Sequence, residues 1–151
     1  MKYRKQLVYL GMVLATLVAC DTKDPHAVKP NGSAQANSAR ALGRRLAQIA
    51  GQTNQAAPAN IDSDTRLDGA RAGPGLKLTI TYTLVNSESD GTNSTTFEAK
   101  LTPVIKKASC TNPDLRSLID QGVVVALEYR GSDGKPIGML SINRDTCAAL
   151  K

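Results

Sequence analysis

Alternation of apolar and polar residues marks two segments of the chain as β-strands. From Leu76 to Leu84, every second residue is leucine, isoleucine or tyrosine, and lysine or threonine stands between them. A period of two is typical of a strand with one buried and one exposed face. The segment from Val123 to Arg130 alternates in the same way and places these side chains on one side: Val123, Val125, Leu127 and Tyr129. Both segments are therefore expected to form a half-buried sheet.

Turn residues next to these segments predict two hairpins. The sequence Ala-Gly-Pro-Gly at 72–75 joins a short strand at 65–71 to the strand at 76–84. The sequence Gly-Ser-Asp-Gly at 131–134 joins the strand at 123–130 to a last strand at 135–143. Glycine and proline supply the backbone angles of tight turns. Pro136, near the start of the last strand, indicates an edge position, because proline cannot donate a backbone hydrogen bond.

Helical spacing fills the interval between the hairpins, after a polar loop expected over residues 86–94. The predicted apolar stripe consists of Phe97, Leu101, Val104, Ile105 and Ala108. Pro103 should kink or restart this helix, and Asn112-Pro113-Asp114 should begin a second one that ends at Gly122. The order β-β-α-α-β-β predicts an α+β fold, in which a small antiparallel sheet carries helices on one face.

The first nineteen residues do not belong to this pattern. Lys2, Arg4 and Lys5 precede an uncharged apolar run from Leu7 to Ala19. As a helix, the run would reach about 20 Å, which is too short for a hydrocarbon core of about 30 Å. A basic flank, a short apolar segment and small residues are typical of a cleaved signal peptide.

The end of this segment, Leu17-Val18-Ala19-Cys20, resembles the lipobox of bacterial lipoproteins. The resemblance implies that Cys20 carries fatty acyl chains, that residues 1–19 are removed, and that the chain is anchored to a cell membrane and faces the periplasm. Several acyl chains give stable anchoring, whereas one chain is marginal. Asp21 resembles the signal for retention in the inner membrane, and the outer membrane remains the alternative.

Residues 20–60 are predicted to be a mostly disordered tether, because they contain few large apolar residues. Within them, Leu42, Leu46 and Ile49 have helical spacing, which predicts a short amphipathic helix over 38–50. One interpretation is a transient solvated helix. The other is a helix that rests on anionic headgroups or a partner through three arginines: Arg40, Arg44 and Arg45. The folded head is expected to be 61–151.

Cysteine usage predicts one structural disulfide. With Cys20 acylated, Cys110 and Cys147 remain as a pair in an exported protein. A bridge between them would close a long loop and stabilise a head that is too small to bury a large core. A cysteine nucleophile is the alternative, but it would lack a histidine to activate it, since the single histidine, His26, lies outside the predicted head.

The net charge of +6 does not indicate nucleic-acid binding once its distribution is considered. Segments 1–19 and 20–60 hold the whole excess of basic residues, and 61–151 holds equal numbers of acidic and basic residues. The chain has no tryptophan and one phenylalanine, which is too few for a base-stacking surface. No phosphate loop, metal-spaced cluster or nucleophile motif occurs, so we expect neither a cofactor nor an enzyme.

Two functions fit these observations. The first is a non-enzymatic, membrane-anchored accessory protein that binds a partner in a secretion, pilus or conjugation assembly, as small pilotin lipoproteins do. The second is an inhibitor, immunity or exclusion lipoprotein that protects the envelope by inserting a loop, from 86–94 or 131–134, into an enzyme. The head is similar to small single-disulfide domains of proteobacterial envelope proteins, which have no assigned role and therefore do not decide between the two.

Overall fold

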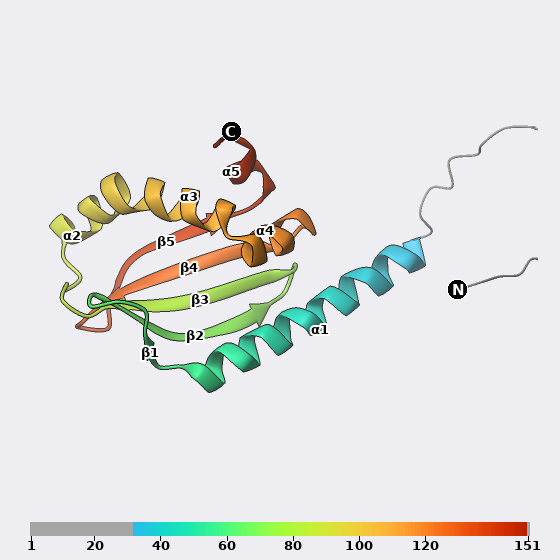
Figure 1. Ribbon diagram of the computed structural model, residues 1–151, viewed down its shortest axis with the longest axis horizontal. Coiled ribbons are helices and arrows are strands. Elements are labelled where there is room, and N and C mark those ends of the chain that lie inside the picture. Colours follow the sequence, from blue (N-terminus) through green and yellow to red (C-terminus); the bar gives the residue numbers. More distant parts are fainter. Residues whose placement is uncertain (1–31, 151) are drawn as a thin grey trace, which may run out of the picture.

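The described part of the chain, residues 32–150 of a computed structural model, forms a five-stranded sheet with helices packed against it (Figure 1). The helices are α1 (Gly32–Ala56), α2 (Gly91–Thr96), the π-helical segment η1 (Phe97–Leu101), α3 (Thr102–Thr111), α4 (Pro113–Asp120) and α5 (Arg144–Ala148). The strands are β1 (Ala59–Asn60), β2 (Thr65–Gly73), β3 (Lys77–Leu84), β4 (Val124–Gly131) and β5 (Pro136–Ile142). The predicted α+β class and the central order β-β-α-α-β-β are confirmed.

The strands lie in the sheet in their chain order, from β1 to β5. Three of the pairings are antiparallel, but β3 and β4 are parallel, with Leu78 opposite Val125. The prediction of a wholly antiparallel sheet is therefore wrong at its centre. The helices from α2 to α4 carry the chain back along the sheet, and such a crossover makes the next strand parallel to the last. Strand β5 lies at the edge, as Pro136 indicates.

The core lies between the helices and one face of the sheet. Leu46 of α1 and Leu118 of α4 pack in one cluster with Leu78 of β3 and Val125 of β4. Helices from both ends of the fold thus cover the same face, which confirms the predicted layering. The alternation along β3 and β4 gives this face its apolar side chains.

The other face of the sheet is polar and carries two small ionic networks. Asp68 accepts hydrogen bonds from Arg66 Nε at 2.7 Å and from Thr83 Oγ1 at 2.5 Å. Glu128 pairs with Arg130 at 2.7 Å and with Arg71 at 3.7 Å. Arg66 and Asp68 stand two residues apart on β2, Glu128 and Arg130 stand two residues apart on β4, and Arg71 reaches Glu128 across β3.

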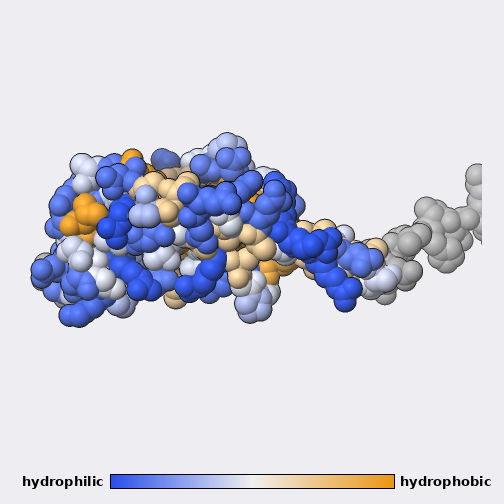
Figure 2. Space-filling view, turned by 90° about the horizontal axis from the view of Figure 1, so that it is seen from below, coloured by the Kyte–Doolittle hydropathy of each residue, from blue (hydrophilic) through white to orange (hydrophobic). Residues whose placement is uncertain are grey.

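Helix α1 corrects the prediction of a mostly disordered tether over residues 20–60. The described part of that segment is helical from Gly32 to Ala56, well beyond the expected 38–50. Leu46 is only 1% exposed because the apolar stripe of the helix packs on the sheet. The folded unit therefore begins before residue 61. The first ten residues of α1 are exposed, and this part of the helix stands out from the body (Figures 1 and 2).

The side chain of Asn54 ties the end of α1 to strand β2. Its amide nitrogen donates to the carbonyl oxygen of Ala70 at 2.9 Å, and its amide oxygen accepts from the Ala70 nitrogen at 2.7 Å. Gly69 lies directly beneath it at a positive φ of 152°, where a Cβ atom would approach the Asn54 oxygen to 2.6 Å. A register shift in β2 at this glycine opens the backbone to the asparagine.

The helical region between the hairpins also departs from the sequence pattern. The loop expected over 86–94 ends at Asp90, whose carboxylate caps α2 by accepting from the Asn93 nitrogen at 2.6 Å. Pro103 stands in the first turn of α3, so the predicted restart is confirmed. Phe97 is buried, but Leu101 and Val104 are exposed. The π-helical turn of η1, which ends at Leu101, widens the helix and turns Leu101 and Val104 away from the predicted stripe.

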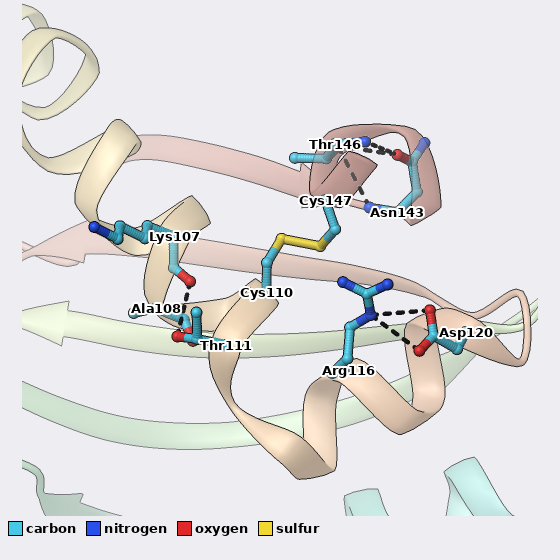
Figure 3. Close-up of a disulfide and its surroundings, with 9 residues drawn as sticks. All are labelled: Lys107, Ala108, Cys110, Thr111, Arg116, Asp120, Asn143, Thr146 and Cys147. Carbon is cyan, nitrogen blue, oxygen red and sulfur yellow. Dashed lines mark hydrogen bonds and ion pairs between the residues drawn. A yellow bond between two sulfur atoms is a disulfide. The ribbon is translucent and has the colours of Figure 1, made fainter. Parts of the chain in front are cut away.

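A disulfide joins Cys110 at the end of α3 to Cys147 in α5, which confirms the predicted pairing (Figure 3). The Cα atoms are 5.4 Å apart, and Cys147 is buried. Asn143 caps α5 by accepting from the Thr146 nitrogen at 2.9 Å. The bond fastens the last short helix, and the strand before it, to the helical layer.

Removal of the disulfide should destabilise the fold strongly. The two cysteines are 37 residues apart in the sequence. Loop entropy predicts that a bond closing a loop of this length adds about 4 kcal/mol to the free energy of unfolding. We expect the Cys110→Ser, Cys147→Ser variant to unfold at a much lower urea concentration. Reductant should lower the urea concentration at which the parent protein unfolds and should leave that of the variant unchanged. Equal stability of the two proteins would contradict this account.

The hydrogen bonds between Asn54 and Ala70 should stabilise the packing of α1 on β2. Asn54→Ala removes both hydrogen bonds to Ala70, and we expect the free energy of unfolding to fall by about 1–2 kcal/mol. Backbone amides in the second half of α1 should exchange faster. Asn37→Ala is the matched control, because Asn37 is exposed on the same helix and alanine favours a helix. Equal stability of the two variants would show that the contact is unimportant.

Candidate binding groove

A groove lies between α1 and α4, with strand β3 as its floor. Its volume is about 540 Å³. Leu78 and Ile80 of β3 form the floor. The walls are Arg45, Gln48, Ile49, Gln52 and Thr53 of α1 and Asp114, Leu115, Ser117 and Leu118 of α4. The groove is thus apolar at its base and polar at its rims, as small binding sites usually are.

The local sequence explains why each wall presents these residues. The groove residues of α1 recur at intervals of three and four, so they form one side of the helix. Helix α4 begins at a fixed point, because the Asn112 side chain accepts from the nitrogens of Asp114 and Leu115, both at 3.0 Å. This cap directs Leu115 over the half-buried Ile80 and leaves Asp114 at the rim.

A second cavity continues along α1 toward its amino terminus. Its volume is about 440 Å³, and it is lined by Ala34, Gln35, Ser38, Ala39, Leu42, Leu76 and Gln121. Its α1 residues extend the same three- and four-residue spacing as those of the groove. One side of α1 therefore borders both cavities, over a helix length of about 28 Å.

The two walls of the groove carry opposite charges. Arg45 on α1 and Asp114 on α4 place opposite charges on the two walls. Within residues 32–150, no three side chains of histidine, cysteine, aspartate or glutamate come close enough together to hold a metal ion. The groove lining offers amide, hydroxyl and aliphatic groups, which can contact a ligand by shape and hydrogen bonding.

Three aromatic rings lie beyond Ile80, toward the end of β3. Tyr82 and Tyr129 stack with ring centroids 5.2 Å apart, and Phe97 lies 5.0 Å from Tyr129. Burial raises the pKa of the Tyr82 phenol. Burial also raises the pKa of Tyr129, and the negative charges of ionised Tyr82 and of Asp62 raise it further. Tyr129 packs against both apolar clusters in the described residues, so the rings join the two clusters.

The structure separates the residues that the sequence singled out. Cys20 and Asp21 lie outside the described residues, as do the signal peptide and His26. Arg40 and Arg44 are exposed on α1, and Arg45 lines the groove. No helix among residues 32–150 is both long and apolar enough to cross a bilayer.

Sequence reasoning missed Leu115, Gln48 and Gln52 as groove residues. The stripe on α1 was visible in the sequence, but its position beside α4 depends on contacts distant in the chain. A pattern within one helix reports which side is buried and not which helix lies next to it.

Solved structures with the same fold include three bacterial proteins. A protein of Pseudomonas aeruginosa described as secreted has a TM-score of 0.60 at 14% identity, and the alignment covers 73% of this chain and 96% of that one. EpsS, a pilotin of the Vibrio vulnificus type 2 secretion system, has a TM-score of 0.59 at 16% identity and coverages of 74% and 96%. AspS, a type II secretion system pilotin of Vibrio cholerae, has a TM-score of 0.57 at 20% identity and coverages of 76% and 99%. No protein-family model and no curated protein sequence matches the chain.

The two half-buried tyrosines should ionise only at a pH above the ordinary pKa of a phenol, because burial raises the pKa of both. Tyr82 and Tyr129 are the only tyrosines in residues 21–151, and the chain has no tryptophan, so the absorbance of tyrosinate reports on them alone. Both pKa values lie above the ordinary 10.0. The unfolded chain therefore loses these protons first, and stability is complete below about pH 10 and declines as the pH rises further. Normal titration of either phenol in the folded protein would contradict the burial of the rings.

Proposed function

We propose that this chain is a non-enzymatic accessory protein of the cell envelope that binds a peptide segment of a secretion-type assembly in the groove between α1 and α4. The groove is the observation that carries the proposal, because it is apolar, open and bordered by two different helices. The fold shared with two secretion-system pilotins supports the choice of assembly.

The geometry of the groove favours a helical segment as the ligand. Strand β3, the floor, lies between β2 and β4, so its backbone groups are already paired. An extended peptide would find no free sheet edge there and would leave its own backbone groups unpaired. An amphipathic helix satisfies its backbone internally and can place apolar side chains on Ile49, Ile80 and Leu115. Its charged residues would match Arg45 on one wall and Asp114 on the other.

The proposal includes anchoring of the chain through acylated Cys20 to a membrane facing the periplasm. Asp21 favours the inner membrane. The disulfide between Cys110 and Cys147 supports an oxidising compartment, because such bonds persist outside the cytoplasm. Separation of the two membranes, followed by mass analysis of the mature amino terminus, tests the anchor and its location.

The alternative of an inhibitor or immunity protein needs a loop that projects from the body. The two candidate segments instead bond to each other. The Ser132 nitrogen donates to the Ser87 carbonyl at 2.8 Å, and Ser89 Oγ donates to the Pro136 carbonyl at 2.6 Å. Residues 86–90 and 131–136 are therefore held against each other. Because neither segment is free to insert into an enzyme, we favour the groove as the binding site.

Polar substitutions in the groove should weaken partner binding strongly without unfolding the protein. A buried isoleucine or leucine contributes about 1.5–3 kcal/mol, so Ile80→Asn and Leu115→Asn should each weaken binding by roughly tenfold or more. Val104→Asn is the matched control, because Val104 is 63% exposed on α3 and does not line the groove. Affinity is measured for the partner captured as described next, and thermal unfolding confirms that each variant is folded.

The partner is identified by a photo-crosslinking residue at Gln52 in living cells, with the same residue at Ser141 on the polar face of the sheet as control. The expected product at Gln52 is a subunit of an envelope assembly, and Ile80→Asn should eliminate it. Deletion of the gene should impair secretion or assembly. Equal products at the two positions, or a deletion that only sensitises cells to a toxin or lysozyme, would overturn the proposal.

A further inference from the structure

We propose that the outer side of α1, through Arg40 and Arg44, docks on the surface of an anionic lipid bilayer while Arg45 remains turned toward the groove. Helix α1 contains three arginines and no acidic residue in its 25 residues. Arg40 and Arg44 are exposed. Basic side chains close to an anionic membrane are attracted to its headgroups.

Helical geometry gives α1 three different sides. Arg44 precedes the buried Leu46 by two residues, which places it about 200° around the helix and away from the core. Arg40 is four residues before Arg44 and lies on the same side. Arg45 is about 100° from Arg44 and lines the groove. Gln48, four residues after Arg44, stands on the groove wall, so Arg44 lies next to the groove rim. A bilayer that contacts Arg40 and Arg44 therefore lies beside the groove and not over its floor.

The contact must be electrostatic, because the apolar side of α1 is already occupied. Leu42, Leu46 and Ile49 belong to the core cluster that also contains residues of the sheet and of α4. The sequence alone suggested a basic amphipathic helix that rests on anionic headgroups or a partner through Arg40, Arg44 and Arg45. In the fold the apolar stripe of this helix is occupied by the core and Arg45 borders the groove, so Arg40 and Arg44 remain for the headgroups. Attraction between exposed charges weakens as salt screens them, whereas insertion of apolar side chains does not.

The opposite end of the molecule is acidic, which orients the docking. The loops after β1, β3 and β4 lie far from the start of α1 (Figure 1). They carry five carboxylates and one lysine: Asp62, Asp64, Glu88, Asp90, Asp133 and Lys135. An anionic surface therefore attracts the side of α1 that carries Arg40 and Arg44, and repels the loop end.

The position of the expected anchor brings this surface to the bilayer. Cys20 lies twelve residues before Gly32, and a chain of that length spans at most about 40 Å. An anchor within this reach gives α1 a high effective concentration at the membrane, so even weak docking is populated. This argument rests on acylation of Cys20, whereas docking itself can be tested on a chain that lacks the anchor.

The experiment measures binding of residues 21–151, which contain every element of the described fold, to sedimented vesicles. Vesicles of phosphatidylglycerol with phosphatidylcholine are compared with vesicles of phosphatidylcholine alone. We expect binding only to the anionic vesicles, loss of binding at high salt, and a reduction of roughly tenfold or more for Arg40→Gln with Arg44→Gln. Glutamine preserves helix propensity.

Two controls make the outcome decisive. Lys100→Gln with Lys107→Gln removes the same charge from exposed sites on η1 and α3 and should reduce binding much less. Arg45→Gln should weaken capture of the groove partner more than vesicle binding, which separates failure of docking from failure of the proposed function. The proposal is overturned by absence of binding to anionic vesicles, by binding that resists salt, or by equal losses for the two double variants.

Discussion

The packing of α1 against the sheet determines most of what this molecule can do. Leu46 and Ala50 enter the same core as the side chains of α4 and the central strands, and Asn54 fixes the end of the helix to β2. Without this contact, residues 32–56 would be a polar segment with few large apolar residues, and no second wall would stand opposite α4. The groove exists because a helix that is weak in isolation is stabilised by tertiary burial.

The other wall depends on the crossover between the two hairpins. Helices α2 to α4 return the chain to the start of the sheet, which makes β4 parallel to β3 and leaves β3 as the floor between the two helical walls. The disulfide fastens α3 to α5, and the cap at Asn112 sets where α4 begins. Rigid walls allow a groove to bind a ligand without a large ordering cost.

Binding and membrane contact can coexist because α1 presents different sides to each. Its buried side holds the sheet, the side with Arg45 borders the groove, and the side with Arg40 and Arg44 faces solvent. The acidic loops at the far end of the molecule increase the difference in charge between that end and the side of α1 that carries Arg40 and Arg44. An accessory protein arranged in this way would hold a partner segment close to the bilayer without covering the groove.

Local patterns in the sequence determined strands β2 to β5, the two hairpins, the cap of α4 at Asn112 and the pairing of Cys110 with Cys147, because alternation, turn residues, caps and cysteine number act over short distances or by elimination. Strand β1, at Ala59–Asn60, fell within the expected tether and was missed. Tertiary structure alone decided the parallel pairing of β3 with β4, the length of α1 and the exposure of Val104. The stripe of Leu42, Leu46 and Ile49 was visible from the start, yet it predicted only a marginal helix in a tether. Its stability comes from Leu78 and Leu118, which lie far away in the chain, and no pattern within residues 38–50 contains that information.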